Sequence, residues 1–271
     1  MPAAVSERET RVWQGKVQSR ALVAGDGPPL VFFHGATGLV WDPFLDRLAE
    51  SFTVYAPEHP GTSPGLPDAI KPIDNLWDLV LSYYEVLDEL GLESPAVVGH
   101  SFGGMVAAEV AASNPARVSQ LVLIDPVGLW IDETPVKNWM ITSPQALGPL
   151  LWADPEGPAA QLMAAPPADE ETAIQAALRT TWSLACTGKF VWPIPDKGLK
   201  KRLHRIKAPT LLVWGEQDGL VPPVYAGLFS EALADAHVEM IAGAGHIPQA
   251  EQLDRTTEVV TAFLNERAGT V

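Results

Sequence analysis

Short apolar runs alternate along this chain with longer segments whose apolar residues recur at helical spacing. Four continuous runs stop at or close to a glycine or an aspartate: "LVFF" (30–33), "AVVG" (96–99), "LVLI" (121–124) and "LLVW" (211–214). Such runs are typical of strands that are buried on both faces. Residues 73–91 instead place apolar side chains every three or four positions and end at Gly91, which predicts a helix with its stop signal.

The remaining segments extend this alternation over most of the chain. Residues 11–25 contain two strand-like stretches, "FTVYAPE" (52–58) and "HVEMIAG" (237–243) read as further strands, and residues 252–267 have the pattern of a final helix. Strands that alternate with helices favour parallel pairing. The sequence therefore predicts an α/β fold: a doubly wound, mostly parallel sheet of about eight strands flanked by helices.

The alternation breaks between residues 127 and 207. This segment is rich in proline, has no strand pattern and contains one clear helical pattern, about 169–187. A segment of this length inside a compact fold is more often a functional lid than a bare loop. We therefore expect a helical cap (127–207) inserted after the sixth strand, and a core domain made of 1–126 and 208–271. The cap holds five of the nine tryptophans, which we expect mainly to pack it onto the core: Trp130, Trp139, Trp152, Trp182 and Trp192.

Composition narrows the range of partners. Hydrophobic residues make up 47% of the chain, enough for a sizeable core, and the formal charge of -15 argues against nucleic acid or an anionic membrane as a partner. The basic stretch 197–207 is interpreted as a solvated surface. No apolar run approaches the roughly 18 residues of a membrane span, and the first residues do not have the order of a secretory signal. With a lone cysteine, Cys186, interpreted as a packing residue, we expect a cytoplasmic protein; its oligomeric state is left open.

A candidate for chemistry lies in "VVGHSFGG", at the junction of a predicted strand and a predicted helix. Gly99 and Gly103 lie two residues on either side of Ser101. A sharp strand-to-helix turn leaves no room for side chains at the flanking positions and strains the central residue. The N–H groups at the start of a helix also favour a developing negative charge. An ordinary tight turn is the alternative, which the other motifs of the chain disfavour.

Four segments in order resemble the motifs of the α/β-hydrolase superfamily, and the resemblance covers nearly the whole chain. They are "FFHG" (32–35), "GHSFGG" (99–104), "LLVWGEQDGLVPP" (211–223) and "AGAGHIPQAEQ" (242–252). The resemblance implies Ser101 as nucleophile, His246 as its general base and Asp218 as the group that orients the imidazole. It also implies an oxyanion hole formed by the backbone N–H groups of Ala36 and Phe102. No cofactor is expected, and no metal or nucleotide motif occurs in the sequence.

Two positions leave questions open. Asp125, at the end of "LVLID", is a second candidate for the acid; we favour Asp218, because its loop matches the family's acid loop as a whole, and interpret Asp125 as a cap of the turn into the lid. The loop "PEHPGTSPG" (57–65) has Glu58 and Ser63 where the superfamily often has aspartate and glycine. Because this loop borders the pocket, the departure weakens any transfer of a substrate from a relative.

The function predicted from these residues is that of a serine hydrolase, a carboxylic ester hydrolase that acts through an acyl-enzyme on a small apolar ester. One alternative is carbon–carbon bond hydrolysis of the meta-cleavage product type, ranked lower because His100 precedes the serine where those enzymes typically carry asparagine. Another is a slow-turnover receptor for a small molecule. We interpret His34 and His100 as structural and His204 and His237 as exposed or packing residues, and the role of His59 is left open.

Overall fold

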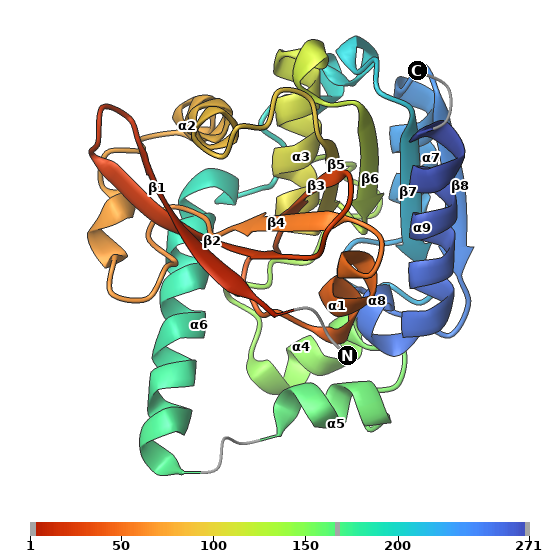
Figure 1. The fold of residues 1–271 in the computed structure, drawn as a ribbon. Helices are drawn as coiled ribbons and strands as arrows, with labels where there is room; N and C mark the ends of the chain where they lie inside the picture. Colours follow the sequence, from red (N-terminus) through yellow and green to blue (C-terminus); the bar gives the residue numbers. More distant parts are fainter. Residues whose placement is uncertain (1–3, 166–168, 269–271) are drawn as a thin grey trace.

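A computed structural model describes residues 4–165 and 169–268 of the chain and places an eight-stranded sheet at its centre (Figure 1). The strand order is β1-β2-β4-β3-β5-β6-β7-β8. The pairs β1/β2 and β2/β4 are antiparallel, and all the others are parallel, which confirms the predicted fold class. The strands are β1 (Ser6–Val12), β2 (Val17–Ala24), β3 (Pro29–Phe33), β4 (Thr53–Pro57), β5 (Ala96–His100), β6 (Gln120–Ile124), β7 (Thr210–Gly215) and β8 (Ala236–Ile241).

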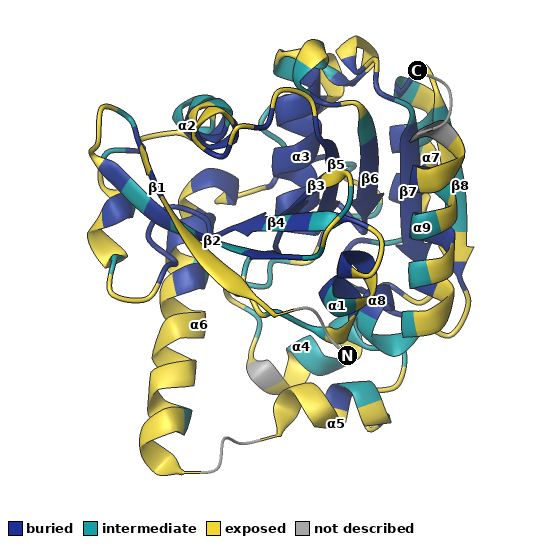
Figure 2. Ribbon diagram, in the orientation of Figure 1, coloured by how far each residue is buried: buried dark blue, intermediate teal, exposed yellow. Residues whose placement is uncertain are grey.

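Helices cover both faces of the sheet and bury its central strands (Figure 2). Apolar side chains of α2 (Leu76–Glu89), α3 (Phe102–Ser113) and α7 (Val224–Ala232) pack into one core on one face. Those of α1 (Pro43–Ala49) and α9 (Leu253–Ala268) form a second core on the other. Strands enclosed in this way need apolar residues at every position, which explains the continuous runs in the sequence.

The parallel register brings the ends of four strands to one edge of the sheet. His100 at the end of β5 pairs with Ile124 at the end of β6, Ile124 pairs with Val213, and Gly215 at the end of β7 pairs with Ile241 of β8. The connections that follow β5, β6, β7 and β8 therefore leave the sheet side by side. In an open α/β sheet this carboxyl edge is where a site is assembled.

The segment after β6 is helical, as predicted, but it contains more helices than its pattern indicated. The helix α6 (Glu170–Val191) begins after Asp169, whose carboxylate accepts from the Thr172 N–H at 2.9 Å. The sequence did not predict α4 (Pro144–Leu151) or α5 (Pro158–Ala164). Pro149 interrupts α4, and α5 has only 7 residues, so neither has a long apolar periodicity. In the described part of the chain, no helix has the length and apolarity needed to cross a membrane.

The basic stretch that follows α6 is only partly a solvated surface. It folds into two short 3-10 turns, Leu199–Lys201 and Leu203–Arg205. Arg202 binds the buried carboxylate of Glu109 on α3 through two hydrogen bonds of 2.6 and 2.8 Å. Arg205 donates to the carbonyl of Ala112 at 2.8 Å. These two arginines therefore tie the end of the helical segment to the core.

The close contact between α3 and β3 can be tested by replacing the glycine that permits it. A Cβ on Gly103 would lie 2.0 Å from the Phe33 carbonyl oxygen, whereas nothing lies within 4 Å of a Cβ on Gly227 in α7. We expect Gly103→Ala to lower the free energy of unfolding by about 3 kcal/mol, because the backbone must move. Gly227→Ala should raise it by about 0.5 to 1 kcal/mol, since alanine favours a helix. Urea unfolding measures both values, and equal midpoints for the two variants would contradict the tight contact.

Candidate active site

Ser101 occupies the turn between β5 and α3 in a strained conformation. Its φ of 54° and ψ of -114° lie outside the regions that non-glycine residues ordinarily adopt. Its N–H donates to the Ile124 carbonyl at 2.9 Å. A Cβ on Gly99 would lie 2.4 Å from the Gly103 carbonyl oxygen, so this close approach of strand and helix requires glycine. The turn holds the serine side chain at the carboxyl edge of the sheet.

A continuous line of hydrogen bonds runs from this serine into the protein. Ser101 Oγ lies 2.8 Å from His246 Nε2, and His246 Nδ1 lies 2.7 Å from Asp218 Oδ2. The second oxygen of Asp218 accepts from the N–H groups of Leu220 and Val221 at 2.8 and 2.9 Å. The structure thus brings together the three side chains singled out in the sequence. A hydroxyl, an imidazole and a carboxylate in this order can move the hydroxyl proton to the imidazole.

The loop that carries His246 lies between β8 and α8 (Pro248–Glu251), and two contacts position it. The His246 N–H donates to the Leu151 carbonyl, at the end of α4, at 2.8 Å. The Glu251 carboxylate accepts from the Gly245 N–H at 2.6 Å and from the Ala153 N–H at 2.8 Å. Glu251 therefore links the histidine loop to the helical segment. The sequence reasoning missed this residue, although it belongs to the motif that carries the histidine.

Ala36 and Phe102, singled out for their backbone N–H groups, lie on either side of the serine. Ala36 follows Gly35, where a Cβ would come within 3.8 Å of Ser101 Cβ, and Phe102 is the first residue of α3. Within residues 4–165 and 169–268, no protein acceptor takes a hydrogen bond from either N–H. The hydroxyl of Thr187, on α6, lies 3.2 Å from the Ala36 carbonyl oxygen. A helix of the segment after β6 thus contacts the loop beside the serine.

Comparison with known proteins agrees with this geometry. The sequence model of the alpha/beta hydrolase family matches residues 30–260. The chain belongs to the alpha/beta hydrolase family. Over 245 residues it is 31% identical to the dihydrolipoyllysine-residue acetyltransferase component of an acetoin cleaving system from Cupriavidus necator, covering 86% of this chain. The chain spans 62% of the length of that relative.

Solved structures show the same fold at lower identity. Naproxen esterase (carboxylesterase NP) from Bacillus subtilis superimposes with a TM-score of 0.75 at 20% identity, covering 97% of this chain and 92% of that one. A meta-cleavage product hydrolase from Pseudomonas fluorescens IP01 superimposes with a TM-score of 0.73 at 21% identity, covering 92% and 95% of the two chains. At these identities the likeness establishes the architecture alone.

Two buried histidines support the loop after β3 in this member of the alpha/beta hydrolase family. The backbone N–H of His59 donates to the ring nitrogen Nε2 of His34 at 3.1 Å. The His34 ring therefore carries its proton on Nδ1, which donates to the Gly35 carbonyl at 2.8 Å. His59 Nε2 donates to the His34 carbonyl at 2.8 Å, which leaves Nδ1 to accept from the Tyr83 hydroxyl. Both rings are therefore neutral. Burial lowers the pKa of His34 to about 4; burial, with the nearby His34, lowers the pKa of His59 well below its usual value.

His100 has a supporting contact of its own. Its Nε2 donates to the His246 carbonyl at 2.8 Å, and the two rings lie 5.2 Å apart. Enclosure of the ring, and then the proximity of His246, lower the pKa of His100 to about 3. This agrees with the structural role predicted for His100. His204 and His237 are exposed, as predicted.

Three further residues from the sequence analysis have structural roles. Glu58 accepts from the Arg20 guanidinium at 2.8 and 3.0 Å, and Ser63 Oγ accepts from the Arg20 N–H at 3.1 Å. The departures from the superfamily pattern thus anchor the loop after β4 to β2.

Burial raises the pKa of the Cys186 thiol to about 11, so this residue is neutral and packs, as predicted.

The sequence suggested that Asp125 caps the turn into the helical segment, and the structure shows that it does not. It is fully buried, and its Oδ1 accepts from the Gly215 N–H on β7 at 3.1 Å. One ligand atom each from Asp125, Asp218 and His246 lie within 4.8 Å of one another. Hydrogen bonds already engage the oxygens of Asp218, His246 Nδ1 and Asp125 Oδ1. We therefore interpret the group as a hydrogen-bonded cluster and not as a metal centre.

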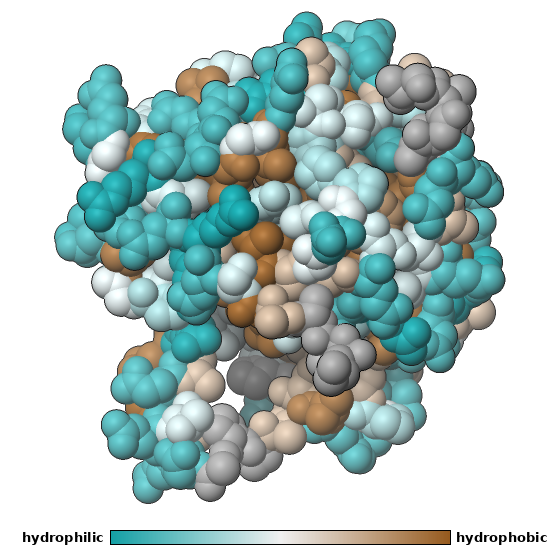
Figure 3. All heavy atoms as spheres, viewed as in Figure 1, coloured by the Kyte–Doolittle hydropathy of each residue, from teal (hydrophilic) through white to brown (hydrophobic). Residues whose placement is uncertain are grey.

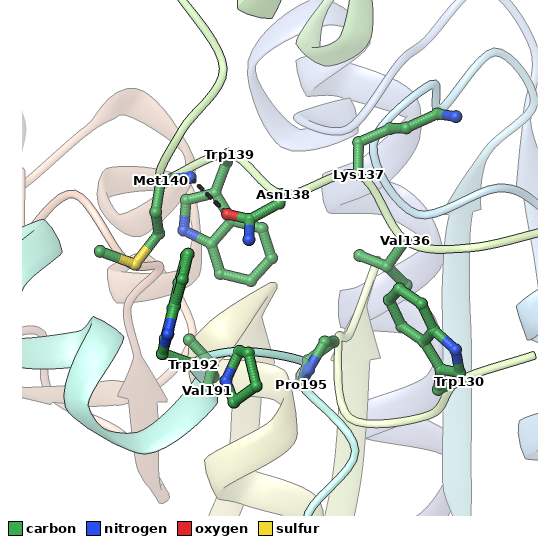
Figure 4. Close-up of a pocket in the computed structure, with 10 residues that line it drawn as sticks. Trp130, Val136, Lys137, Asn138, Trp139, Met140, Val191, Trp192 and Pro195 are labelled. Carbon is green, nitrogen blue, oxygen red and sulfur yellow. Dashed lines mark hydrogen bonds between the residues drawn. The ribbon is translucent and has the colours of Figure 1, made fainter.

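Three of the five tryptophans of the segment after β6 line a pocket, and two of these, Trp130 and Trp139, also pack against the core. Trp130, Trp139 and Trp192 line a cavity of about 90 Å³, which is otherwise mainly apolar and includes Met140 (Figure 4). All of its lining residues belong to residues 127–207. Trp182 donates its indole N–H to the Gly61 carbonyl at 2.9 Å and so connects α6 to the core.

The neutral histidines make stability depend on pH with a definite sign. In the folded protein, the pKa values of His34, His59 and His100 lie below the usual 6.5. Between about pH 6.5 and 4 the unfolded chain therefore binds protons that the native state does not bind, and the free energy of unfolding falls as the pH falls. Asp42, whose pKa burial raises to about 6, acts in the opposite direction. The informative quantity is therefore the change that a single variant causes in the slope of unfolding free energy against pH.

We expect His34→Gln to reduce the slope of unfolding free energy against pH, between pH 4.5 and 6, by about 1 kcal/mol per pH unit. The matched control is His204→Gln, since that side chain is exposed and its replacement should change the slope little. Urea unfolding at several pH values measures both slopes. Parallel curves for wild type and His34→Gln would show that His34 is not held neutral.

Proposed function

We propose that this chain is a serine hydrolase that cleaves carboxylic esters of small apolar acids through an acyl-enzyme on Ser101. The observation that carries the proposal is the hydrogen-bonded line from Ser101 through His246 to Asp218, which starts at a strained turn. Serine is a weak nucleophile until a base accepts its proton, and this line supplies the base and the group that orients it. The family match, and the fold it shares with a carboxylesterase, support the same conclusion.

In the proposed reaction, Ser101 Oγ attacks the ester carbonyl while its proton passes to His246 Nε2. Asp218 holds the opposite ring nitrogen and stabilises the imidazolium. The N–H groups of Ala36 and Phe102 stabilise the tetrahedral oxyanion, a contribution of about 3 kcal/mol for each donor. The imidazolium then protonates the departing alcohol, and a water molecule repeats the sequence to release the acid.

We also propose that residues 127–207 form a cap domain over a core of 1–126 and 208–271, and that the cap supplies the substrate pocket. Two contacts join the cap to the candidate site, Leu151 with His246 and Thr187 with Ala36, and a third, Trp182 with Gly61, joins it to the core. Figure 3 shows a hollow on this face between α5 and α6, with both hydrophilic and apolar side chains around it. Several large apolar side chains of these helices and the chain around them are exposed: Ile141, Leu162, Met163, Ile174 and Leu178. Such a surface suits an apolar small molecule.

Replacement of the nucleophile tests the mechanism. We expect Ser101→Ala to lower kcat on p-nitrophenyl esters by about 10⁴-fold or more and to abolish labelling by a fluorophosphonate. Ser94→Ala, at an exposed position, is the matched control and should behave as wild type. Wild-type turnover by Ser101→Ala would exclude the mechanism. Release of one equivalent of nitrophenol by wild type, without turnover, would favour the slow receptor; turnover of a meta-cleavage dienoate but of no ester would favour carbon–carbon hydrolysis.

Replacement of a pocket tryptophan tests the substrate class. Trp139→Ala should lower kcat/KM for an octanoate ester about tenfold more than for an acetate ester, because a long acyl chain needs the apolar wall. Trp77→Ala, at a 55% exposed position on α2, should leave kcat/KM unchanged for both the octanoate and the acetate ester. The measurement is the profile of kcat/KM over acyl-chain length. Equal losses on both esters, or a wild-type preference for charged esters, would show that the pocket does not bind the acyl chain.

A further inference from the structure

Asp125 is a buried acid that takes no part in the proposed reaction, and two hydrogen bonds to β7 hold it in place. Its φ of 43° lies in the left-handed region that glycine favours. Its N–H donates to the Val213 carbonyl at 3.0 Å, and its Oδ1 accepts from the Gly215 N–H at 3.1 Å. Both partners belong to β7, whose following turn carries Asp218. The side chain is therefore fixed on the strand that presents the candidate acid of the triad.

The other oxygen of Asp125 has no donor to bind. Its Oδ2 is buried and, within the described residues, receives no hydrogen bond. The Asp125 carboxylate lies in one cluster with the carboxylate of Asp218 and the ring of His246, with one ligand atom of each within 4.8 Å of the others, and the carboxylate of Glu251 on α8 contributes further negative charge. A buried carboxylate oxygen beside a second carboxylate is costly unless one of the two acids holds a proton.

The contacts decide which acid holds it. Asp218 accepts three hydrogen bonds, from Leu220, Val221 and His246, and these stabilise its ionised form. Asp125 accepts one, from Gly215. Burial raises the pKa of the Asp125 carboxyl well above its usual value, and the negative charge of Asp218 raises it further. The proton therefore belongs to Asp125.

We propose that Asp125 is a positioning residue, a neutral carboxylic acid that donates a hydrogen bond to the Asp218 carboxylate and holds it in line with His246. The inference rests on the proposed function of the Ser101–His246–Asp218 line and adds a fourth member to it. The proton satisfies the otherwise unpaired Oδ2 and fixes the Asp218 carboxylate against rotation. No net proton is consumed, since Asp125 keeps its proton through the cycle.

Two isosteric variants separate a hydrogen-bond donor from a packing residue. Asparagine keeps an oxygen for the Gly215 N–H and supplies an N–H₂ group for Asp218, whereas leucine has the same shape and supplies neither. We expect Asp125→Asn to keep kcat on p-nitrophenyl acetate within about fivefold of wild type, and Asp125→Leu to lose about 10- to 100-fold in kcat with little change in KM. Asp218→Asn, as the reference, should lose about 10⁴-fold.

A second measurement does not depend on turnover. In ¹³C spectra of protein labelled at the aspartate carboxyl carbons, wild type at pH 7.5 should show a neutral carboxyl that is missing from Asp125→Asn. Asp42, whose pKa is about 6, should by then be largely ionised. This result is expected even if the protein hydrolyses no ester, so a failure of the proposed function and a failure of this inference are distinguishable.

The proposal is overturned if every aspartate carboxyl is ionised at pH 7.5, or if the neutral carboxyl persists in Asp125→Asn. It is equally overturned if Asp125→Asn loses as much kcat as Asp125→Leu, or if Asp125→Leu is folded and fully active. A loss of about 10⁴-fold in Asp125→Asn, with Asp218→Asn only mildly impaired, would instead make Asp125 the acid of the triad. If Asp125→Leu does not fold, the spectra and the rate of Asp125→Asn decide.

Discussion

The rest of the structure depends on the close approach between the start of α3 and the ends of β3 and β5. A Cβ on Gly103 would lie 2.0 Å from a carbonyl oxygen of β3, and one on Gly99 would lie 2.4 Å from the Gly103 carbonyl oxygen. Because the helix starts so close to the sheet, the residue between them takes a positive φ and its side chain projects from the edge of the sheet. The same approach places the first N–H of α3 beside that side chain. Strain at Ser101 and the position of its hydroxyl thus have one cause.

Three histidines beneath this edge, His34, His59 and His100, are hydrogen-bonded while they remain neutral. The His34 and His59 rings donate and accept in a fixed order that ends at the Tyr83 hydroxyl, and a proton added to either ring would face a donor. His100 donates to the backbone of His246. Buried neutral networks of this kind are rigid, since each member has few alternative partners. The loops that carry Ala36 and His246 are therefore supported from below by groups that avoid the cost of a buried charge.

The helical segment after β6 completes the site from the opposite side. The end of α4 receives the His246 N–H, Glu251 bridges the histidine loop and Ala153, and α6 contacts the loop after β3 through Thr187. At its far end, Arg202 is bound to the buried Glu109. A segment connected at so many points to the loops of the candidate site affects their geometry as well as access to them. Replacements in it therefore have two routes by which they can alter function.

The sequence by itself predicted the class of the fold and the order of its strands along the chain, and its resemblance to a known family implied the residues of the candidate site. Continuous apolar runs identify strands enclosed on both faces, and the glycines around Ser101 identify a turn without room for side chains. These signals are local, because each depends on neighbours within a few residues. The helices α4 and α5 gave no such signal, since Pro149 interrupts α4 and α5 is only 7 residues long. The roles of Glu58 and Arg202 depend on partners that lie far away in the chain. The tertiary structure alone decided that Asp125 faces Asp218, that Glu251 and Thr187 support the site, and that three tryptophans surround one pocket. Each of these contacts joins segments brought together only by sheet register and cap packing, which no local pattern of residues encodes.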